Sequence, residues 1–312
     1  MKTVLITGGT GFVGSNLARR CLKEGHRVHL LLRDGYQSWR IQEIEKEVRT
    51  HIQILTNTDS ISKLLRHVAP DWIFHLATEG AYPWQNDTAG IISTNLNGTI
   101  SLLDAAIAQG FECFVNTGSS SEYGFKDHAP SENEIIEPNS EYAIAKAAAT
   151  HYCEMSAKRD TLPIATLRLY SVYGPWEDPR RLIPSLIEAG LQKIFPPLVD
   201  PDISRDFVFV DDVVDAYLQL AEQFSSGSYL GRDNQIYNVG SGNQLSLGKI
   251  VSLCQQEFAI QDEPTWGTMP NRKWDSAIWC SDPKKIQTAI GWSARTTFVE
   301  GFKKTIEWQV RS

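Results

Sequence analysis

Hydrophobic residues in the first half of the chain fall into short runs separated by segments of helical periodicity. The runs are apolar and rich in β-branched residues, which is typical of strands buried on both faces of a sheet. Between the runs, apolar residues recur at intervals of three and four, which predicts amphipathic helices. The predicted strands are 2–6, 27–32, 52–55, 72–77, 112–116 and 164–169, and the predicted helices follow residue 14 and cover 60–67, 90–109 and 141–159.

This alternation predicts an α/β fold with a Rossmann-type, doubly wound parallel sheet. We assign residues 1–169 to a dinucleotide-binding domain that also receives parts of 206–240. After residue 169 the chain becomes richer in aromatic residues and proline. We therefore expect residues 170–312 to form mainly a smaller α/β domain, and we expect the chain to cross this boundary more than once.

A glycine-rich segment, TGGTGFVG at residues 7–14, connects the first predicted strand to the first predicted helix. Glycines at this point permit a tight turn, close backbone approach to a pyrophosphate, and close packing of the helix on the strand. The alternative, a glycine-rich hairpin, does not explain why a strand precedes the segment and a helix follows it. The predicted dinucleotide contacts are Gly8, Gly11, Phe12, Val13 and Gly14.

The end of the second predicted strand bears on which dinucleotide binds. An NAD site of this kind has an acidic residue there that accepts a hydrogen bond from the ribose 2′-hydroxyl. In this chain the position is Leu32, and Arg33 follows it. A guanidinium pairs well with a 2′-phosphate, so NADP is favoured and NAD is the alternative. Asp34 would restore an acidic partner after a shift of two residues, and Arg33 would then be a solvated charge.

A tyrosine and a lysine four residues apart lie in the predicted helix 141–159. On a helix, Tyr142 and Lys146 project from the same face. A nearby cation lowers the pKa of a tyrosine from about 10, so Tyr142 would pass protons to or from a carbinol or ketone. A lone YxxxK pattern is more often an interfacial aromatic beside a solvated charge. Here the pattern supports a catalytic pair, because the same chain carries the glycine loop that is predicted to bind a dinucleotide.

The last residues of the strand 72–77 are expected to face the cofactor, since parallel strands present their carboxyl ends to ligands. Leu76, Ala77 and Thr78 are therefore predicted cofactor contacts. His75 lies inside the apolar run, so we interpret it as a hydrogen-bonded core residue and not as a catalytic one.

Charge and composition exclude several classes of partner. The 312 residues carry a net charge of −7, which gives no electrostatic reason to expect nucleic acid or an anionic membrane as partner. The five cysteines are scattered, with no CxxC pattern or Cys/His cluster, which argues against a disulfide framework and a metal site. The N-terminal strand leaves no room for a signal peptide, so a cytoplasmic protein is expected.

Four motifs occur together in this order: TGGTGFVG at 7–14, GSSSEYG at 118–124, YAIAK at 142–146 and RDFVFVDD at 205–212. With this ordered set the chain resembles the extended short-chain dehydrogenase/reductase family, in particular its nucleotide-sugar epimerase, dehydratase and 4-ketoreductase branch. The resemblance covers nearly the whole chain, down to Asp282-Pro283-Lys284-Lys285-Ile286 and Ile290-Gly291-Trp292.

The resemblance implies a catalytic triad in which Tyr142 is the acid/base, Lys146 supports it, and Ser119 orients the sugar oxygen. It implies a nucleoside-diphosphate sugar as the bound partner and a homodimer built from the predicted helices 90–109 and 141–159. It further implies an adenine contact by Asn57, where relatives often have an aspartate. The implied substrate contacts are Ser120, Ser121, Arg205 and Arg272, the two arginines holding the diphosphate.

One departure from the family pattern concerns the 4,6-dehydratases. These enzymes carry an acidic pair, Asp-Glu or Ser-Glu, where this chain has Ser120-Ser121. The nearest acid, Glu122, is shifted by one position and would point to the opposite side if the segment were extended. Dehydration is therefore disfavoured.

Three functions are consistent with these observations. The first is NADPH-dependent reduction of a 4-keto, often 6-deoxy, nucleotide sugar, which the Leu32-Arg33 pair favours. The second is a nucleotide-sugar 4-epimerase with tightly bound NAD, which would use the same triad. The third, a non-catalytic dinucleotide sensor, does not explain why Ser119, Tyr142 and Lys146 are all present.

Overall fold

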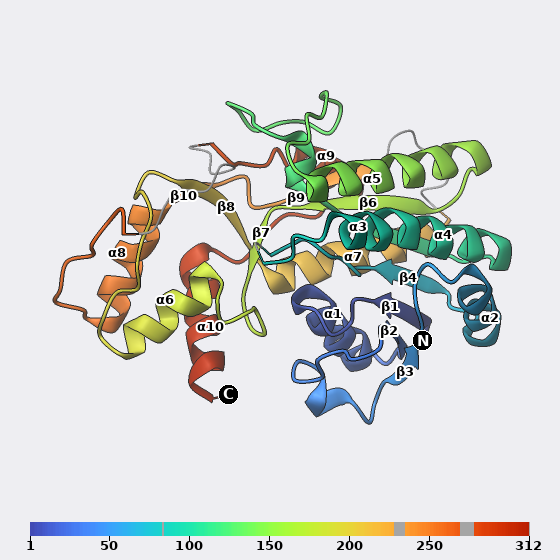
Figure 1. Cartoon of the computed structure of the whole chain (residues 1–312), viewed down its shortest axis with the longest axis horizontal. Helices are drawn as coiled ribbons and strands as arrows, with labels where there is room; N and C mark the ends of the chain where they lie inside the picture. The colour runs from blue at the N-terminus through green and yellow to red at the C-terminus, as the bar shows by residue number, and fades with distance from the viewer. Residues whose placement is uncertain (83, 228–234, 269–277, 312) are drawn as a thin grey trace.

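The computed structural model describes residues 1–82, 84–227, 235–268 and 278–311. Its larger part is built on a sheet of seven parallel strands in the order β3-β2-β1-β4-β5-β6-β9 (Figure 1). The strands are β1 (Thr3–Thr7), β2 (Arg27–Leu32), β3 (Arg49–Ile52), β4 (Trp72–His75), β5 (Cys113–Ser119), β6 (Ile164–Leu169) and β9 (Ile236–Val239). The order reverses direction at β1, as in a doubly wound Rossmann fold, so the predicted fold class is confirmed.

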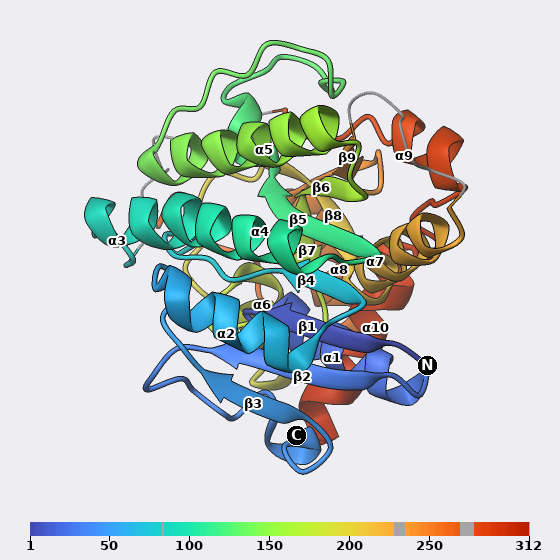
Figure 2. The same cartoon turned by 90° about the vertical axis from the view of Figure 1, so that its right-hand side faces the viewer.

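Helices cover both faces of this sheet (Figure 2). Alternate residues of β1 enter different cores, with Val4 and Ile6 on one side and Leu5 on the other, as a strand buried on both faces requires. The first core also contains residues of α1 (Phe12–Lys23), α7 (Val210–Ser225) and α9 (Lys284–Ile290). The second contains residues of α2 (Thr58–Val68), α4 (Gly98–Gln109) and α5 (Glu141–Asp160).

A smaller region has its own core and a three-stranded sheet in the order β10-β8-β7. Its strands are β7 (Ser171–Tyr173), β8 (Ser204–Phe209) and β10 (Gln244–Ser246). Its helices are α6 (Leu182–Leu191), α8 (Leu247–Phe258) and α10 (Phe298–Arg311). Between β8 and β10 the chain returns to the large sheet to form β9, so the two regions exchange segments.

Two predicted elements differ from the structure. The third strand is Arg49–Ile52 and not 52–55, because the polar residues 49–51 pair with β2 at the exposed edge of the sheet. The predicted helix 90–109 is three pieces: α3 (Thr88–Ile92), a π-helical turn η2 (Ser93–Asn97) and α4. Two 3₁₀ turns, η1 (Gln42–Ile44) and η3 (Ser120–Tyr123), are also present.

The five cysteines are all unpaired thiols. Within the described residues, no group of three or more His, Cys, Asp or Glu side chains is arranged to hold a metal ion. No helix in the part of the chain that the structure describes combines the length and the apolar character needed to cross a bilayer.

Candidate functional site

The glycine loop lies at the carboxyl end of β1 and leads directly into α1. Gly8 has a φ of +68°, and a Cβ on Gly14 would lie 2.3 Å from the carbonyl oxygen of Gly8. The N-cap of α1 is Gly11, which provides no side-chain cap. The N–H groups of the first helical turn therefore have no intrahelical acceptor, and they suit an anion such as a pyrophosphate. The loop fits the dinucleotide predicted for it.

Two arginines flank this loop. Arg33 follows the last residue of β2, its side chain is 77% exposed, and its Nη1 lies 3.7 Å from a carboxylate oxygen of Glu79. Arg40 is buried, and its Nη1 approaches the carbonyl oxygen of Thr10 in the glycine loop at 3.4 Å. The Nη2 of Arg40 has no hydrogen-bond partner within the described residues. Sequence reasoning missed Arg40 because it lies eight positions beyond the strand end.

Asp34, the acidic alternative to Arg33 for contacting the ribose, makes a contact with its own backbone segment. Asp34 is exposed, and its carboxylate accepts a hydrogen bond from the backbone N–H of Gly35 at 2.9 Å. Leu32, at the position of the usual acid, is buried in the core.

The segment after β4 is held by the π-helical turn. The side chain of Asn95 in η2 accepts hydrogen bonds from Thr78 Oγ1 and from the backbone N–H of Glu79, both at 3.0 Å, and donates to the Glu79 carbonyl at 2.7 Å. The Ala77 N–H donates to Thr7 Oγ1 on β1 at 3.0 Å. π-Helical turns often occur at functional sites, and this one holds Thr78 and Glu79, while Thr7 on β1 holds Leu76 and Ala77. The sequence pattern carried no signal for it.

The structure brings the three predicted catalytic residues together. Ser119 ends β5, and Tyr142 and Lys146 lie one turn apart on α5. The Tyr142 hydroxyl is close enough to the Ser119 and Thr78 side chains for both to lower its pKa. The Lys146 Nζ donates to the carbonyl oxygen of Thr117 at 2.9 Å and lies 6.0 Å from the centre of the Tyr142 ring.

The predicted lowering of the pKa of Tyr142 is wrong for this arrangement. Burial raises the pKa of Tyr142 above its ordinary value, and the hydrogen bonds with Ser119 and Thr78 only partly oppose this. Burial also lowers the pKa of Lys146 to about 8, while the carboxylate of Glu122 acts in the opposite direction. Tyr142 therefore holds its proton at neutral pH, and Lys146 is mostly charged there.

The serine-rich turn is a 3₁₀ helix, so the argument that would hold for an extended segment does not apply to Glu122. In η3 the backbone N–H of Ser121 donates to Ser119 Oγ at 3.2 Å, and Glu122 is fully buried. Trp279, which sequence reasoning missed, donates from Nε1 to Ser120 Oγ at 3.1 Å. No local sequence pattern indicates this contact, because the two residues are 159 positions apart.

Other predicted contacts have mixed outcomes. Arg205 lies on β8 with its guanidinium carbon 5.5 Å from the centre of the Trp279 ring, so it is on the same side as Ser120. Arg272 lies outside the described residues. Asn57 is the N-cap of α2 and accepts a hydrogen bond from the Ser60 N–H at 3.1 Å. Its adenine contact stays a prediction.

The interpretation of His75 as a core residue is confirmed. Its ring nitrogens contact Thr7 Oγ1 at 2.7 Å and Thr99 Oγ1 at 2.9 Å, and burial lowers its pKa to about 3.

We predict a pH dependence of stability from His75. The unfolded chain binds a proton at this residue below about pH 6.5, whereas the folded chain does so only near pH 3. The free energy of unfolding should therefore fall as pH decreases through this window, by up to about 1.4 kcal/mol per pH unit. Urea titrations of the wild type and His75→Gln at pH 7 and pH 4.5 measure it. An equal loss of stability in both proteins would contradict the prediction.

Comparison with known proteins identifies the family of the chain. Residues 4–240 match the model of the NAD dependent epimerase/dehydratase family. The UDP-glucose 4-epimerase of Mycolicibacterium smegmatis is 30% identical, over 99% of this chain and 98% of that protein. A probable dTDP-glucose 4,6-dehydratase of Sinorhizobium fredii is 26% identical, over 99% of this chain and 93% of that protein.

Solved structures agree over the same length. The UDP-glucose 4-epimerase of Thermotoga maritima with UDP-glucose has a TM-score of 0.87 and 27% identity, covering 99% of this chain and 98% of that one. The UDP-glucuronic acid 4-epimerase of Bacillus cereus, in complex with UDP-glucuronic acid and NAD, has a TM-score of 0.82 and 25% identity, with 99% of both chains covered. The chain therefore belongs to the NAD-dependent epimerase/dehydratase family of extended short-chain dehydrogenases/reductases.

Proposed function

We propose that this enzyme reduces the 4-keto group of a nucleoside-diphosphate sugar, often a 6-deoxy sugar, with NADPH. The observation that carries the proposal is the carboxyl end of β2, where Leu32 replaces the usual acid and Arg33 stands next to it. The raised pKa of Tyr142 is a second support, because a phenol that keeps its proton at neutral pH is ready to donate it.

In the proposed reaction the sugar carbonyl gains a hydride at carbon and a proton at oxygen. When bound, the nicotinamide supplies the hydride. Tyr142 donates its phenolic proton to the carbonyl oxygen, and Ser119 donates a hydrogen bond that orients the same oxygen. The charge of Lys146 stabilises the phenolate that remains on Tyr142.

The two arginines beside the glycine loop are the proposed 2′-phosphate site. Arg33 supplies an exposed guanidinium at the strand end, and Arg40 supplies a buried one with an unpartnered nitrogen. A buried donor without an acceptor costs roughly 1–3 kcal/mol, which an anionic ligand at this position would recover. We propose that Arg205 and Arg272 hold the sugar nucleotide's diphosphate, so that residues 170–312 serve mainly the substrate.

We predict that Arg33→Glu weakens NADPH binding much more than NADH binding. The substitution replaces an attraction for the 2′-phosphate by a repulsion, while NADH carries no charge at that position. Fluorescence titration with both dinucleotides measures the change in Kd. Arg66→Glu is the matched control, since it makes the same charge change in the last turn of α2. Equal effects of Arg33→Glu on both dinucleotides would contradict the assignment.

A 4-epimerase with retained NAD is the second candidate. It is favoured by the full-length similarity to the UDP-glucose 4-epimerase of Mycolicibacterium smegmatis. The two functions are separated by denaturing freshly purified protein and identifying any released dinucleotide, followed by titration with NAD, NADH, NADP and NADPH. Stoichiometric NAD would favour the epimerase, and a preference for added NADPH would favour the reductase.

We also propose a homodimer that pairs α4 and α5 with their copies. Ile144 and Met155, on α5, are 50% and 45% exposed, and large apolar side chains on one helix are candidates for such a contact.

A further inference from the structure

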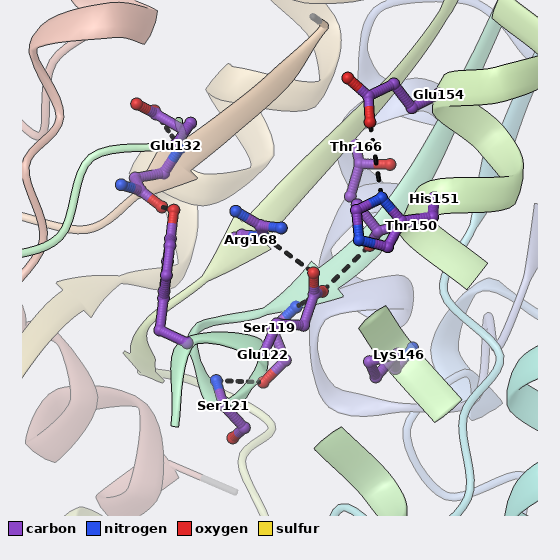
Figure 3. Close-up of polar contacts among 12 residues, drawn as sticks. Ser119, Ser121, Glu122, Glu132, Lys146, Thr150, His151, Glu154, Thr166 and Arg168 are labelled. Carbon is purple, nitrogen blue, oxygen red and sulfur yellow. Dashed lines mark hydrogen bonds and ion pairs between the residues drawn. The ribbon is translucent and has the colours of Figure 1, made fainter. Parts of the chain in front are cut away.

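A buried carboxylate lies directly behind the serine of the proposed triad. The side chain of Glu122 accepts a hydrogen bond from the backbone N–H of Ser119 at 2.8 Å and one from Thr150 Oγ1 at 3.0 Å, both at the same oxygen. Its second oxygen accepts from Arg168 Nε at 2.8 Å. Figure 3 shows these contacts converging on Glu122, in η3, from β5, α5 and β6. Glu122 and Arg168 have side chains only 0% and 2% exposed.

The neighbouring backbone leaves room for this carboxylate. Gly118, on β5, pairs with Arg168 on β6. A Cβ on Gly118 would lie 2.6 Å from Glu122 Oε1 and 2.8 Å from Thr166 Cγ2. Any larger residue would push the carboxylate away from its donors. The absence of a side chain at Gly118, near the end of β5, therefore provides the space that the Glu122 carboxylate occupies.

The same contacts link Glu122 directly to Ser119 and, through Thr150, to the helix that carries Tyr142 and Lys146. Ser119 is held through its own backbone and through the 3₁₀ turn that follows it, where Glu122 and Ser119 form a reciprocal capping box. Thr150 lies one turn after Lys146 and two turns after Tyr142 on α5, so it belongs to the same helix face. Glu122 thus joins the strand that carries Ser119 to the helix that carries Tyr142.

We propose that Glu122, paired with Arg168 and hydrogen-bonded by Thr150, is a positioning residue that sets Ser119 relative to Tyr142 and Lys146. In this proposal Glu122, the acid of the serine turn, holds the site residues in place and does not catalyse elimination of water. This inference rests on the proposed triad, and it holds for reduction and for epimerisation alike.

The electrostatic surroundings of Lys146 support this role. Besides Glu122, the groups that face it are Cys153 on α5 and His75 on β4. Burial raises the pKa of the Cys153 thiol and lowers that of His75 to about 3, so both are neutral between pH 7 and 9. Glu122 is then the charged group that favours the ammonium form of Lys146. Glu122 also raises the pKa of Tyr142, whereas Arg181 lowers it.

The test uses variants that separate charge, hydrogen bonding and stability. Glu122→Gln alone leaves the Arg168 charge buried and unpaired, which is strongly destabilising, so a loss of activity in that variant does not separate lost positioning from lost folding. The neutral pair Glu122→Gln/Arg168→Gln removes both charges together. Thr150→Val removes one donor to the carboxylate at nearly constant volume. Thr166→Val is the matched control, because Thr166 is a buried threonine on β6 that bonds Asn116 and not Glu122.

Each variant is assayed with UDP-4-keto-6-deoxy-D-glucose and NADPH, together with dinucleotide titration and thermal unfolding. We expect the neutral pair to fold, to bind NADPH like the wild type, and to lose about 10- to 100-fold in kcat with little change in KM. Thr150→Val should show a smaller loss in kcat of the same kind. Thr166→Val should be unaffected.

The pH dependence of kcat/KM distinguishes this role from a purely structural one, which would leave the pH dependence unchanged. Without the Glu122 charge the pKa values of Lys146 and Tyr142 both fall. Reduction needs Lys146 charged and Tyr142 protonated, so the alkaline limb of kcat/KM should shift to lower pH in the neutral pair.

Three results would overturn the proposal: a neutral pair with wild-type kcat and pH profile, a loss confined to KM or to dinucleotide affinity, or an equal loss in Thr166→Val. If the wild type itself does not reduce the keto sugar, the proposed function fails. The same variants are then compared by the rate at which UDP-glucose is converted to its C4 epimer with bound NAD, where the same ranking of rates is expected and equal rates would overturn the inference.

Discussion

Replacing Tyr142 by phenylalanine should reduce kcat by about 100- to 10,000-fold, the contribution of a positioned acid or base. The variant keeps the aromatic ring and loses only the hydroxyl, whose pKa Ser119 and Thr78 lower. Dinucleotide affinity should be nearly unchanged, because the glycine loop is untouched. Steady-state kinetics with UDP-4-keto-6-deoxy-D-glucose and fluorescence titration with NADPH measure the two quantities.

The matched control for this variant is Tyr152→Phe on the same helix. The Tyr152 hydroxyl donates to Asp104 at 2.6 Å on the surface, so its loss should leave turnover intact. Undiminished turnover in Tyr142→Phe, or an equal loss in both variants, would remove Tyr142 from its proposed role.

Replacing Gly14 by alanine should weaken dinucleotide binding by about 10- to 100-fold, which corresponds to the roughly 1–3 kcal/mol that overpacking costs. The new Cβ would lie 2.3 Å from the carbonyl oxygen of Gly8, so the loop and α1 must move apart. The movement displaces the amides that would hold the pyrophosphate. Titration with NADPH measures the Kd, and circular dichroism checks that the protein is folded.

Gly248→Ala is the control for this substitution. Gly248 lies in the first turn of α8, and its nearest new contact would be 3.4 Å from Pro201, an ordinary van der Waals distance. Alanine there should preserve NADPH affinity and favour the helix by up to about 1 kcal/mol. If Gly14→Ala bound NADPH as tightly as the wild type, the loop would not be the dinucleotide site.

Local patterns were sufficient for the parts of this fold that depend on neighbouring residues. The run 3–7, the glycines at 8, 11 and 14, and the helix after them are adjacent in the chain, so their spacing predicts a strand, a turn and a helix. The common face of Tyr142 and Lys146 follows from helix geometry alone. His75 was assigned to the core because apolar residues surround it in sequence.

The features of the site that the sequence did not predict depend on packing between residues that are far apart in the chain. Asn95 is directed at Thr78 by a π-helical turn that has no distinct periodicity. Trp279 reaches Ser120 from another region of the fold. Glu122 is buried because Arg168, 46 positions away, neutralises it. The direction of the Tyr142 pKa depends on burial, which spacing on a helix does not reveal.

The central claim, net reduction of a 4-keto nucleotide sugar by NADPH, is tested most directly by isotope transfer. The purified enzyme is incubated with UDP-4-keto-6-deoxy-D-glucose and NADPH carrying deuterium at both positions of C4 of the nicotinamide, so that whichever hydride is transferred is labelled. The account predicts one deuterium at C4 of the sugar for each dinucleotide oxidised, and a rate that falls when NADH replaces NADPH. Conversion of UDP-glucose to its C4 epimer with retained NAD, and no deuterium transfer from added NADPH, would contradict it.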